Sequence, residues 1–283
     1  MRAIVSPDAT PDTTRLEAMI KKLERAYGVP RWQPTHDPLG ELIATILSQN
    51  TSDVNSDRAY AALRTAYPTW EAALQAAPDR LAAVIRSGGL ATLKSQRIQA
   101  ILRALKAGDG GLSLDFLRHM PMPAARAFLA EFPGVGPKTI ACVLLFACGH
   151  PAFPVDTHIH RVTTRLGLLP ARCTAERAHT VLEPGIPPHK VYSAHVNLIR
   201  HGRSVCQARR PDCQRCCLRR SCPYPQHLAR SHAGGEGTSQ ALAAVSRQQE
   251  GAGRDMSPQR VISSGTPQGG PLGWDGHDRY EPH

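Results

Sequence analysis

The sequence predicts an all-α protein. Apolar residues recur at intervals of three and four, alanine is abundant, and runs of alternating β-branched residues do not occur. Turn signals such as residues 87–89 (Ser-Gly-Gly) and 108–110 (Gly-Asp-Gly) separate the helical stretches. A chain of 283 residues is long enough for one large domain or two small ones. We therefore expect helices joined by short loops.

Five apolar stripes have helical spacing, and each predicts a helix with one buried face. They are Leu39, Leu42, Ile43, Ile46 and Leu47; Leu81, Val84 and Ile85; Ile98, Ile101, Leu102 and Leu105; Ile140, Val143, Leu144 and Ala147; and Ile159, Val162 and Leu166. The longest apolar run, from Ile140 to Cys148, is about half of the roughly 20 residues that a membrane span needs. We expect no membrane partner.

The charge of the chain points to a polyanionic partner. Its formal net charge is +11 and its isoelectric point is about 9.6. Aromatic residues make up only 5% of the chain, which argues against a single-strand binder that stacks bases. The N-terminus has no signal-peptide pattern, so the eight cysteines are expected to be reduced thiols or metal ligands.

The composition changes near residue 225. Gly, Pro, Ser and Gln account for 26 of the 58 residues from Gln226 to His283, and apolar periodicity is lost. This segment is too poor in apolar surface to offset the entropy of ordering, so we predict a disordered tail over 226–283. Its five Arg and six acidic residues leave the positive charge on residues 1–225. Residues 1–13 are predicted to be a flexible lead.

A glycine-rich hairpin lies between two apolar stripes, in the sequence Pro133-Gly134-Val135-Gly136-Pro137-Lys138. Gly134 and Gly136 allow backbone amides to approach a ligand, and Pro137 suits the first turn of a helix, so the hairpin predicts a phosphate site. Lys138 would lie at the positive end of that helix, which predicts a lowered pKa and an amine nucleophile. The hairpin alone also fits an ordinary helical corner with a solvated lysine.

Asp156 follows a proline-rich loop and precedes the stripe that begins at Ile159. It is a natural N-cap, and that role explains it fully by itself. The functional hypothesis places its carboxylate beside Lys138, where it would stabilise positive charge or move protons. Both roles are compatible, because a cap fixes the side chain. His158 and His160 fit packing or phosphate contacts better than metal ligation.

Cys206, Cys213, Cys216 and Cys222 have the spacing C-x6-C-x2-C-x5-C. Four thiolates within so short a segment can surround one soft metal centre, and a [4Fe-4S] cluster suits them better than zinc, which usually takes two close pairs. Spacing alone leaves the metal open, and Cys217 is a competing ligand. Arg209 and Arg210 lie in the first loop, where a bound metal would hold both guanidinium groups toward phosphates.

Together and in this order, these motifs resemble the endonuclease III family of the helix-hairpin-helix DNA glycosylase superfamily. The resemblance covers about residues 14–224 and includes two further loops, 46–53 and the Gly89-Leu90 loop before Lys94. It implies a helix-hairpin-helix DNA glycosylase fold: a six-helix barrel over 36–150, and a [4Fe-4S] cluster domain built from 14–35 with 151–225.

The resemblance also implies an activity, namely base excision of oxidised pyrimidines with β-elimination at abasic sites through a Schiff base on Lys138. Asp156 is the essential carboxylate by the same resemblance. The implied DNA contacts are Gln49, Asn50, Leu90, Gly134, Gly136, Arg209 and Arg210. The implied partner is double-stranded DNA with damaged bases or abasic sites. We expect a monomer in the cytoplasm, at the nucleoid if the source is bacterial.

Two positions depart from the family pattern. Asn50 stands where the family commonly has Gln, and Ala91 follows Leu90 where an aromatic residue is frequent. Both bear on lesion specificity. Two other functions stay open: an adenine-mismatch glycosylase of the same superfamily, which usually lacks a lysine at position 138, and a non-catalytic, metal-stapled DNA-binding module.

Overall fold

The computed structural model describes residues 12–35, 37–108 and 110–225. The described residues up to Ser221 form one compact unit. The described residues form helices and loops without a β-strand, so the all-α prediction is confirmed. Most of the predicted N-terminal lead and the whole predicted tail lie outside the described residues. None of the helices described is long and apolar enough to cross a membrane.

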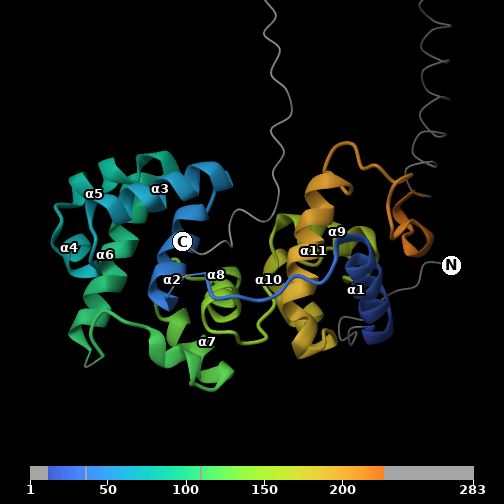
Figure 1. Cartoon of the computed structure of the whole chain (residues 1–283), viewed down its shortest axis with the longest axis horizontal. Helices are drawn as coiled ribbons and strands as arrows, with labels where there is room; N and C mark the ends of the chain where they lie inside the picture. The colour runs from blue at the N-terminus through green and yellow to red at the C-terminus, as the bar shows by residue number, and fades with distance from the viewer. Residues whose placement is uncertain (1–11, 36, 109, 226–283) are drawn as a thin grey trace, which may run out of the picture. The chain divides into compact units, whose positions relative to one another are not determined.

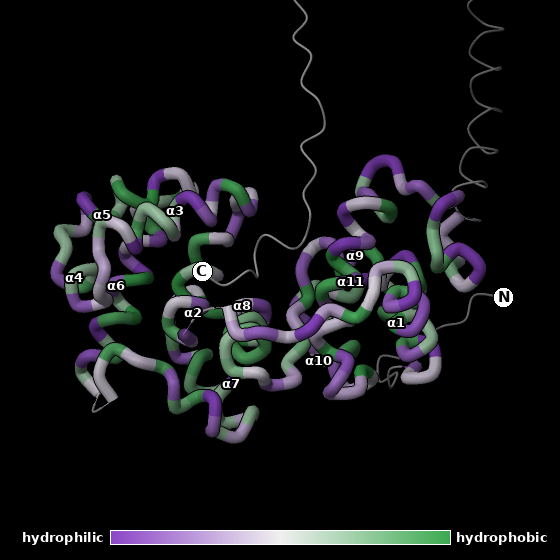
Figure 2. The backbone as a smooth tube through the Cα atoms, in the orientation of Figure 1, coloured by the Kyte–Doolittle hydropathy of each residue, from purple (hydrophilic) through white to green (hydrophobic). Residues whose placement is uncertain are grey.

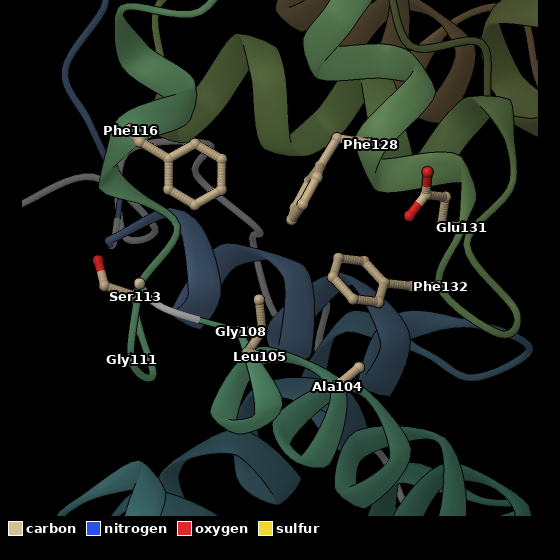
Figure 3. Close-up of a pocket in the computed structure, with 10 residues that line it drawn as sticks. Ala104, Leu105, Gly108, Gly111, Ser113, Phe116, Phe128, Glu131 and Phe132 are labelled. Atoms are coloured by element: carbon tan, nitrogen blue, oxygen red, sulfur yellow. The ribbon is translucent and has the colours of Figure 1, made fainter.

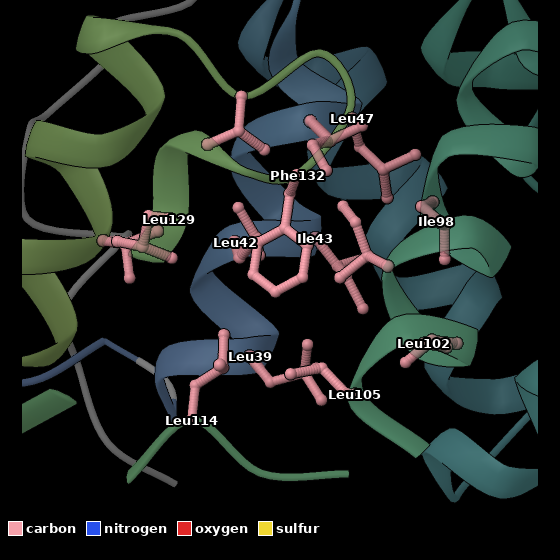
Figure 4. Close-up of a cluster of buried hydrophobic side chains, with 14 of the residues drawn as sticks. Leu39, Leu42, Ile43, Leu47, Ile98, Leu102, Leu105, Leu114, Leu129 and Phe132 are labelled. Carbon is pink, nitrogen blue, oxygen red and sulfur yellow. The ribbon is translucent and has the colours of Figure 1, made fainter. Parts of the chain in front are cut away.

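Helix α2 (Pro38–Ser48) is the central element of the larger hydrophobic core. Its residues from Pro38 to Ile43 are all buried, because α3 (Asp53–Ala66) packs on one side and α8 (Pro137–Cys142) on another. Figure 1 shows α2 close to both helices. Figure 4 shows how the apolar side chains of α2 meet those of α6 (Ala91–Ala107) around Phe132.

The remaining helices between α2 and α8 in the chain are short. They are α4 (Trp70–Gln75), α5 (Pro78–Val84), α7 (Met122–Ala130) and the 3-10 turns η1 (Arg86–Gly88) and η2 (Asp115–Arg118). The predicted stripes at 81–85 and 98–105 are the buried faces of α5 and α6. Hydrophilic and hydrophobic residues alternate along α6, as expected for a helix with one buried face (Figure 2).

The helices that follow α8 pack with the first helix of the chain. α11 (Val191–Ser204) contacts both α1 (Thr13–Tyr27) and α9 (Thr157–Arg165), and α10 (Ala175–Leu182) lies against α8 and α9. The 3-10 turns here are η4 (Glu183–Gly185), η5 (Pro188–Lys190) and η6 (Arg219–Ser221). An ion pair of 2.7 Å between Lys190 and Glu24 joins the two ends of this group.

The predicted stripe from Ile140 to Ala147 is buried, but it is not one regular α-helix. The α-helix ends at Cys142, and Val143–Ala147 (η3) forms a π-helical turn. Donors from other segments bond its carbonyls: Trp32 donates to Leu145 at 2.7 Å and Arg118 donates to Ala147. These long-range hydrogen bonds satisfy the carbonyls that the wider turn leaves open. The sequence pattern, being local, does not contain them.

Candidate active site

The predicted hairpin joins α7 to α8, and its two glycines differ in backbone conformation and in the space around them. Gly134 has a φ of +75°, and a Cβ there would lie 2.6 Å from the Arg97 side chain. Gly136 is the N-cap of α8 with extended backbone and has open space around it. Val135 between them is buried and anchors the hairpin in the core. Pro137 occupies the first turn of α8, as predicted.

Lys138 lies in the first turn of α8, half-buried, and its side chain hydrogen-bonds that of Cys142 one turn later. The pKa of Lys138 is raised above its ordinary value, because Cys142 first, and then Asp156 and Glu41, stabilise the ammonium more than burial destabilises it. Burial raises the pKa of the Cys142 thiol to about 11, so this neighbour is a neutral thiol at pH 7. The predicted lowering of the Lys138 pKa is therefore wrong, because Cys142 of the same helix, together with Asp156 and Glu41 from other elements, outweighs the helix end.

Asp156 is the N-cap of α9, as predicted, and its carboxylate accepts a 2.7 Å hydrogen bond from the Ile159 amide. The same carboxylate is close enough to Lys138 to raise the pKa of that lysine. The structure thus brings the two sequence-predicted residues within electrostatic range, although 17 residues separate them in the chain. One carboxylate oxygen of Asp156 is fixed by the cap.

Glu41 is a second carboxylate near Lys138 that the sequence analysis missed. It lies in the first turn of α2 with only 8% of its surface exposed, and it raises the pKa of Lys138. Thr35 donates a short hydrogen bond to one carboxylate oxygen, and Thr45 donates to the other at 3.3 Å. A charged residue between Leu39 and Leu42, inside an apolar stripe, was the signal that could have revealed it.

His195 of α11 is also missing from the predicted site. Its ring is 4% exposed, packs 5.3 Å from the Phe146 ring, and its Nδ1 lies 3.0 Å from the Pro154 carbonyl oxygen. Burial lowers the pKa of His195 to about 4, although the nearby Asp156 opposes the shift. The imidazole is therefore neutral at pH 7, so it adds no positive charge beside Asp156.

The two loops expected to enter DNA differ in how their side chains are placed. The Gln49 amide is already bonded: it donates to the Gly134 carbonyl at 3.1 Å and accepts from Arg97 at 3.2 Å. Asn50, in contrast, is exposed and has a φ of +54°. Leu90 is 56% exposed, with a φ of +48°. Of these two neighbouring residues, Asn50 has the more exposed side chain.

A cavity of about 260 Å³ lies elsewhere, between the end of α6, the loop after it and α7. Figure 3 shows Phe116, Phe128 and Phe132 around it, with Glu131 near its edge. Phe116 and Phe128 meet edge to face, with ring centroids 5.2 Å apart. Neither Lys138 nor Asp156 lines this cavity, so it is not part of the site described above.

The cysteine loop is organised by side chains of α9. The loop closes on itself through a 2.9 Å hydrogen bond from the Asp212 amide to the Val205 carbonyl. The Arg165 guanidinium donates to the Cys206 sulfur at 3.3 Å, to the Gln207 carbonyl at 2.7 Å, and to the Ala208 carbonyl at 2.8 Å. Arg165 therefore fixes residues 206–208 of the loop. The exposed Arg209 and Arg210 follow directly after them.

Two of the predicted ligand sulfurs have N–H donors beside them. Arg165 lies next to Cys206, and the Leu218 amide donates to the Cys216 sulfur at 3.4 Å. Donors of this kind stabilise anionic thiolates, so the residues fit a soft metal centre. In the part of the chain that the structure describes, no three His, Cys, Asp or Glu side chains are arranged to hold a metal ion. Cys217, the competing ligand, is exposed.

Comparisons with known proteins identify similar sequences and structures. A family model described as HhH-GPD superfamily base excision DNA repair protein matches residues 43–188. Endonuclease III of Thermotoga maritima is 34% identical over 209 residues, which are 73% of this chain and 93% of that protein. A plant protein named "Putative DNA glycosylase At3g47830", from Arabidopsis thaliana, is 37% identical over 165 residues, 58% of this chain and 56% of the plant protein.

Among solved structures, a non-covalent endonuclease III–DNA complex superposes with a TM-score of 0.65 at 27% identity. The match covers 77% of this chain and 98% of that one. The matched family model spans the hairpin, Lys138 and Asp156. The chain belongs to the endonuclease III family, within the HhH-GPD superfamily of base excision DNA repair proteins.

Proposed function

We propose that this protein is a bifunctional base-excision DNA glycosylase and abasic-site lyase, acting on oxidised pyrimidines in duplex DNA. The single observation that carries the proposal is that Lys138, at the end of a glycine-rich hairpin, lies within electrostatic range of the capping carboxylate of Asp156. A non-catalytic DNA-binding module has no need for a half-buried amine beside a fixed carboxylate.

In the proposed reaction the hairpin amides and Leu90 hold bent DNA with the damaged nucleotide extruded. The Lys138 ammonium first gives up a proton to water, because its raised pKa makes the charged form dominant at pH 7. The neutral amine then attacks C1′ of the sugar, the N-glycosidic bond breaks, and the base leaves with its electron pair and takes up a proton. Asp156 stabilises the positive charge that develops on the sugar.

Opening of the sugar ring gives an iminium between Lys138 and C1′. The iminium acidifies the C2′ proton, and loss of that proton breaks the C3′–O bond, with the 3′ phosphate as the leaving group. Water then hydrolyses the Schiff base and restores the amine. We assign these proton transfers to Asp156, whose carboxyl group is held in place by the cap of α9.

We assign Cys206, Cys213, Cys216 and Cys222 to a [4Fe-4S] cluster. Bound to these thiolates, the cluster would act structurally, by cross-linking a loop too short to form a core of its own. The donors beside Cys206 and Cys216 support this assignment, and the exposed Arg209 and Arg210 of the same loop would contact DNA phosphates. We further propose that the protein acts as a monomer in the cytoplasm.

Borohydride reduction of the Schiff base tests the proposed function. Wild-type protein should be trapped covalently on duplex DNA carrying an abasic site, whereas Lys138→Ala should not be trapped. Lys106→Ala, which removes an exposed lysine from α6, is the matched control and should be trapped like the wild type. Trapping of folded Lys138→Ala at the wild-type rate would overturn the assignment of the nucleophile.

The substrate class is tested separately by single-turnover excision. Duplexes containing thymine glycol, dihydrouracil, an abasic site, or adenine opposite 8-oxoguanine would be compared. The ring-saturated pyrimidines stack poorly and should be released faster than adenine, because their extrusion costs less. Fastest release of adenine would favour the adenine-mismatch glycosylase, and cleavage of abasic DNA alone would leave only the lyase activity.

A further inference from the structure

Lys94 is a buried lysine with no place in the proposed chemistry. It lies at the end of the first turn of α6, and only 1% of its surface is exposed. Its ammonium donates three hydrogen bonds to backbone carbonyls: to Leu47 at 2.7 Å, to Gln49 at 2.6 Å and to Gly88 at 2.7 Å. A lysine ammonium has three donors, so all of them are used.

The three acceptors lie where two helical segments end. Leu47 and Gln49 belong to the carboxyl end of α2, for which Gln49 is the C-cap, and Gly88 closes η1. Carbonyls at such ends lack a partner within the helix and carry the negative end of its dipole. One ammonium thus serves as a shared cap for both segments, which compensates for burying its charge. Burial and, to a smaller degree, Arg97 lower the pKa of Lys94.

Each bonded segment leads directly into a residue with unusual backbone geometry. Asn50 follows Gln49 and has a φ of +54°, and Leu90 lies two residues after Gly88 with a φ of +48°. Left-handed backbone is unfavourable for a leucine, and such conformations persist only where the surrounding structure holds them. Asn50 and Leu90 are also exposed, so neither is held by packing of its own side chain.

Arg97, one turn after Lys94, adds a connection to the hairpin. Its guanidinium donates to the Gln49 side chain at 3.2 Å, and the Gln49 amide donates to the Gly134 carbonyl at 3.1 Å. The first turns of α6 therefore join the loop after α2 to the loop before α6, and join both to the hairpin. The direct link between the two loops is the Lys94 ammonium.

We propose that Lys94 is a positioning residue that sets the spacing between Asn50 and Leu90 for base extrusion. The inference rests on the proposed function and adds two roles to it: Leu90 would fill the space that the extruded nucleotide leaves, and Asn50 would face the orphaned base. It separates two steps: extrusion from duplex DNA depends on the Lys94 link, whereas Schiff-base chemistry at Lys138 does not.

The test uses Lys94→Met, which keeps the chain length and removes the ammonium. Excision of thymine glycol from duplex DNA should slow by about 10- to 100-fold, the range expected for losing a hydrogen-bonded buried charge. Borohydride trapping on single-stranded abasic DNA, which has no orphaned base to open, should stay within about twofold of wild type. Lys106→Met makes the same change at an exposed site of α6 and should match wild type on both substrates.

Equal slowing of Lys94→Met on both substrates would overturn the proposal, because it would indicate a general loss of structure. Wild-type rates on both substrates would also overturn it. Should Lys94→Met not fold, the same comparison is made with Lys94→Arg, whose planar guanidinium keeps the charge without the geometry for three converging carbonyls.

Hydrogen exchange separates the failure of this proposal from that of the proposed function. In Lys94→Met, amides of residues 49–51 and 88–91 should exchange faster, while those of α8 stay unchanged. Unchanged exchange in both loops would refute the link even if the enzyme were a glycosylase. A wild-type protein that is inactive on every DNA substrate would refute the proposed function, and with it the role of the Lys94 link in base extrusion. Hydrogen exchange would still show whether the Lys94 link between the two loops exists.

Discussion

The side chains of Lys138 and Cys142 lie one helical turn apart on α8 and share a hydrogen bond. As a neutral thiol Cys142 raises the pKa of Lys138 through this hydrogen bond, whereas Asp156 and Glu41 raise it through their charges. The resting site is therefore an ammonium held by a thiol and two carboxylates. Activation of the amine depends on how strongly these neighbours hold its proton.

Cys142→Ala should shift the pH dependence of the single-turnover rate to lower pH. Loss of one hydrogen bond of about 0.5–1.5 kcal/mol lowers the pKa of Lys138 and raises the neutral fraction of the amine by about two- to tenfold. The rate near pH 7 should rise by a similar factor. Cys148→Ala, which removes a thiol just beyond the π-helical turn, is the control; an unchanged or opposite shift in Cys142→Ala would contradict the prediction.

Asp156→Asn separates capping from charge. Asn is as good an N-cap as Asp, so the free energy of unfolding should change by less than about 0.5 kcal/mol, while excision should slow by about 10²- to 10⁴-fold. Asp156→Ala removes the cap as well and should cost about 1 kcal/mol of stability. Urea unfolding and single-turnover kinetics measure the two effects. A destabilised Asp156→Asn with full activity would show that the residue is structural only.

Gly134→Ala and Gly136→Ala are a matched pair within the hairpin. Gly134 has a φ of +75°, and a Cβ would lie 2.6 Å from Arg97, whereas Gly136 has a φ of −98° and open space. Gly134→Ala should lower the free energy of unfolding by about 1–3 kcal/mol and weaken DNA binding. Gly136→Ala should cost less, about 0.5 kcal/mol, because its only penalty is that alanine is a poorer N-cap than glycine. Equal effects of the two substitutions on urea unfolding would argue against the strained geometry.

Acid should destabilise the protein through His195. Its pKa is about 4 in the folded state, against 6.5 as the ordinary value, so protonation favours the unfolded chain. Stability should fall between about pH 6.5 and pH 4, with a contribution from this group of up to about 1.4 kcal/mol per pH unit. His195→Asn should flatten the dependence measured by urea unfolding, and His119→Asn, at an exposed site, should leave it as in wild type. An equally steep dependence in His195→Asn would contradict the assignment.

Protein purified without oxygen should contain about four irons and four acid-labile sulfides per chain. Cys213→Ser should lose iron, because it removes one of four proposed ligands. Cys217→Ser removes the exposed neighbouring thiol and should retain iron. Stoichiometric zinc without sulfide would replace the cluster assignment with a zinc site, and loss of iron from Cys217→Ser would mean that the ligand set is shifted.

Local patterns in the sequence were sufficient for much of the scaffold. The stripes at 39–47, 81–85, 98–105 and 159–166 are buried helical faces, and Asp156 caps the helix that it precedes. These features depend on residues three or four positions apart, and that spacing can be read directly from the sequence. The hairpin was predicted for the same reason, since glycine and proline act on their own backbone.

Properties that depend on long-range neighbours could not be read in this way. The direction of the Lys138 pKa shift was wrong, because Cys142 one turn along α8, and Glu41 and Asp156 from α2 and from the start of α9, together outweigh burial and the helix end. The π-helical turn depends on donors such as Trp32, more than a hundred residues away in the chain. The sequence by itself determined the helices and the residue types of the site. Only the tertiary structure decided the proton affinity of Lys138 and the link made by Lys94, because electrostatic and hydrogen-bond energies depend on distances in space.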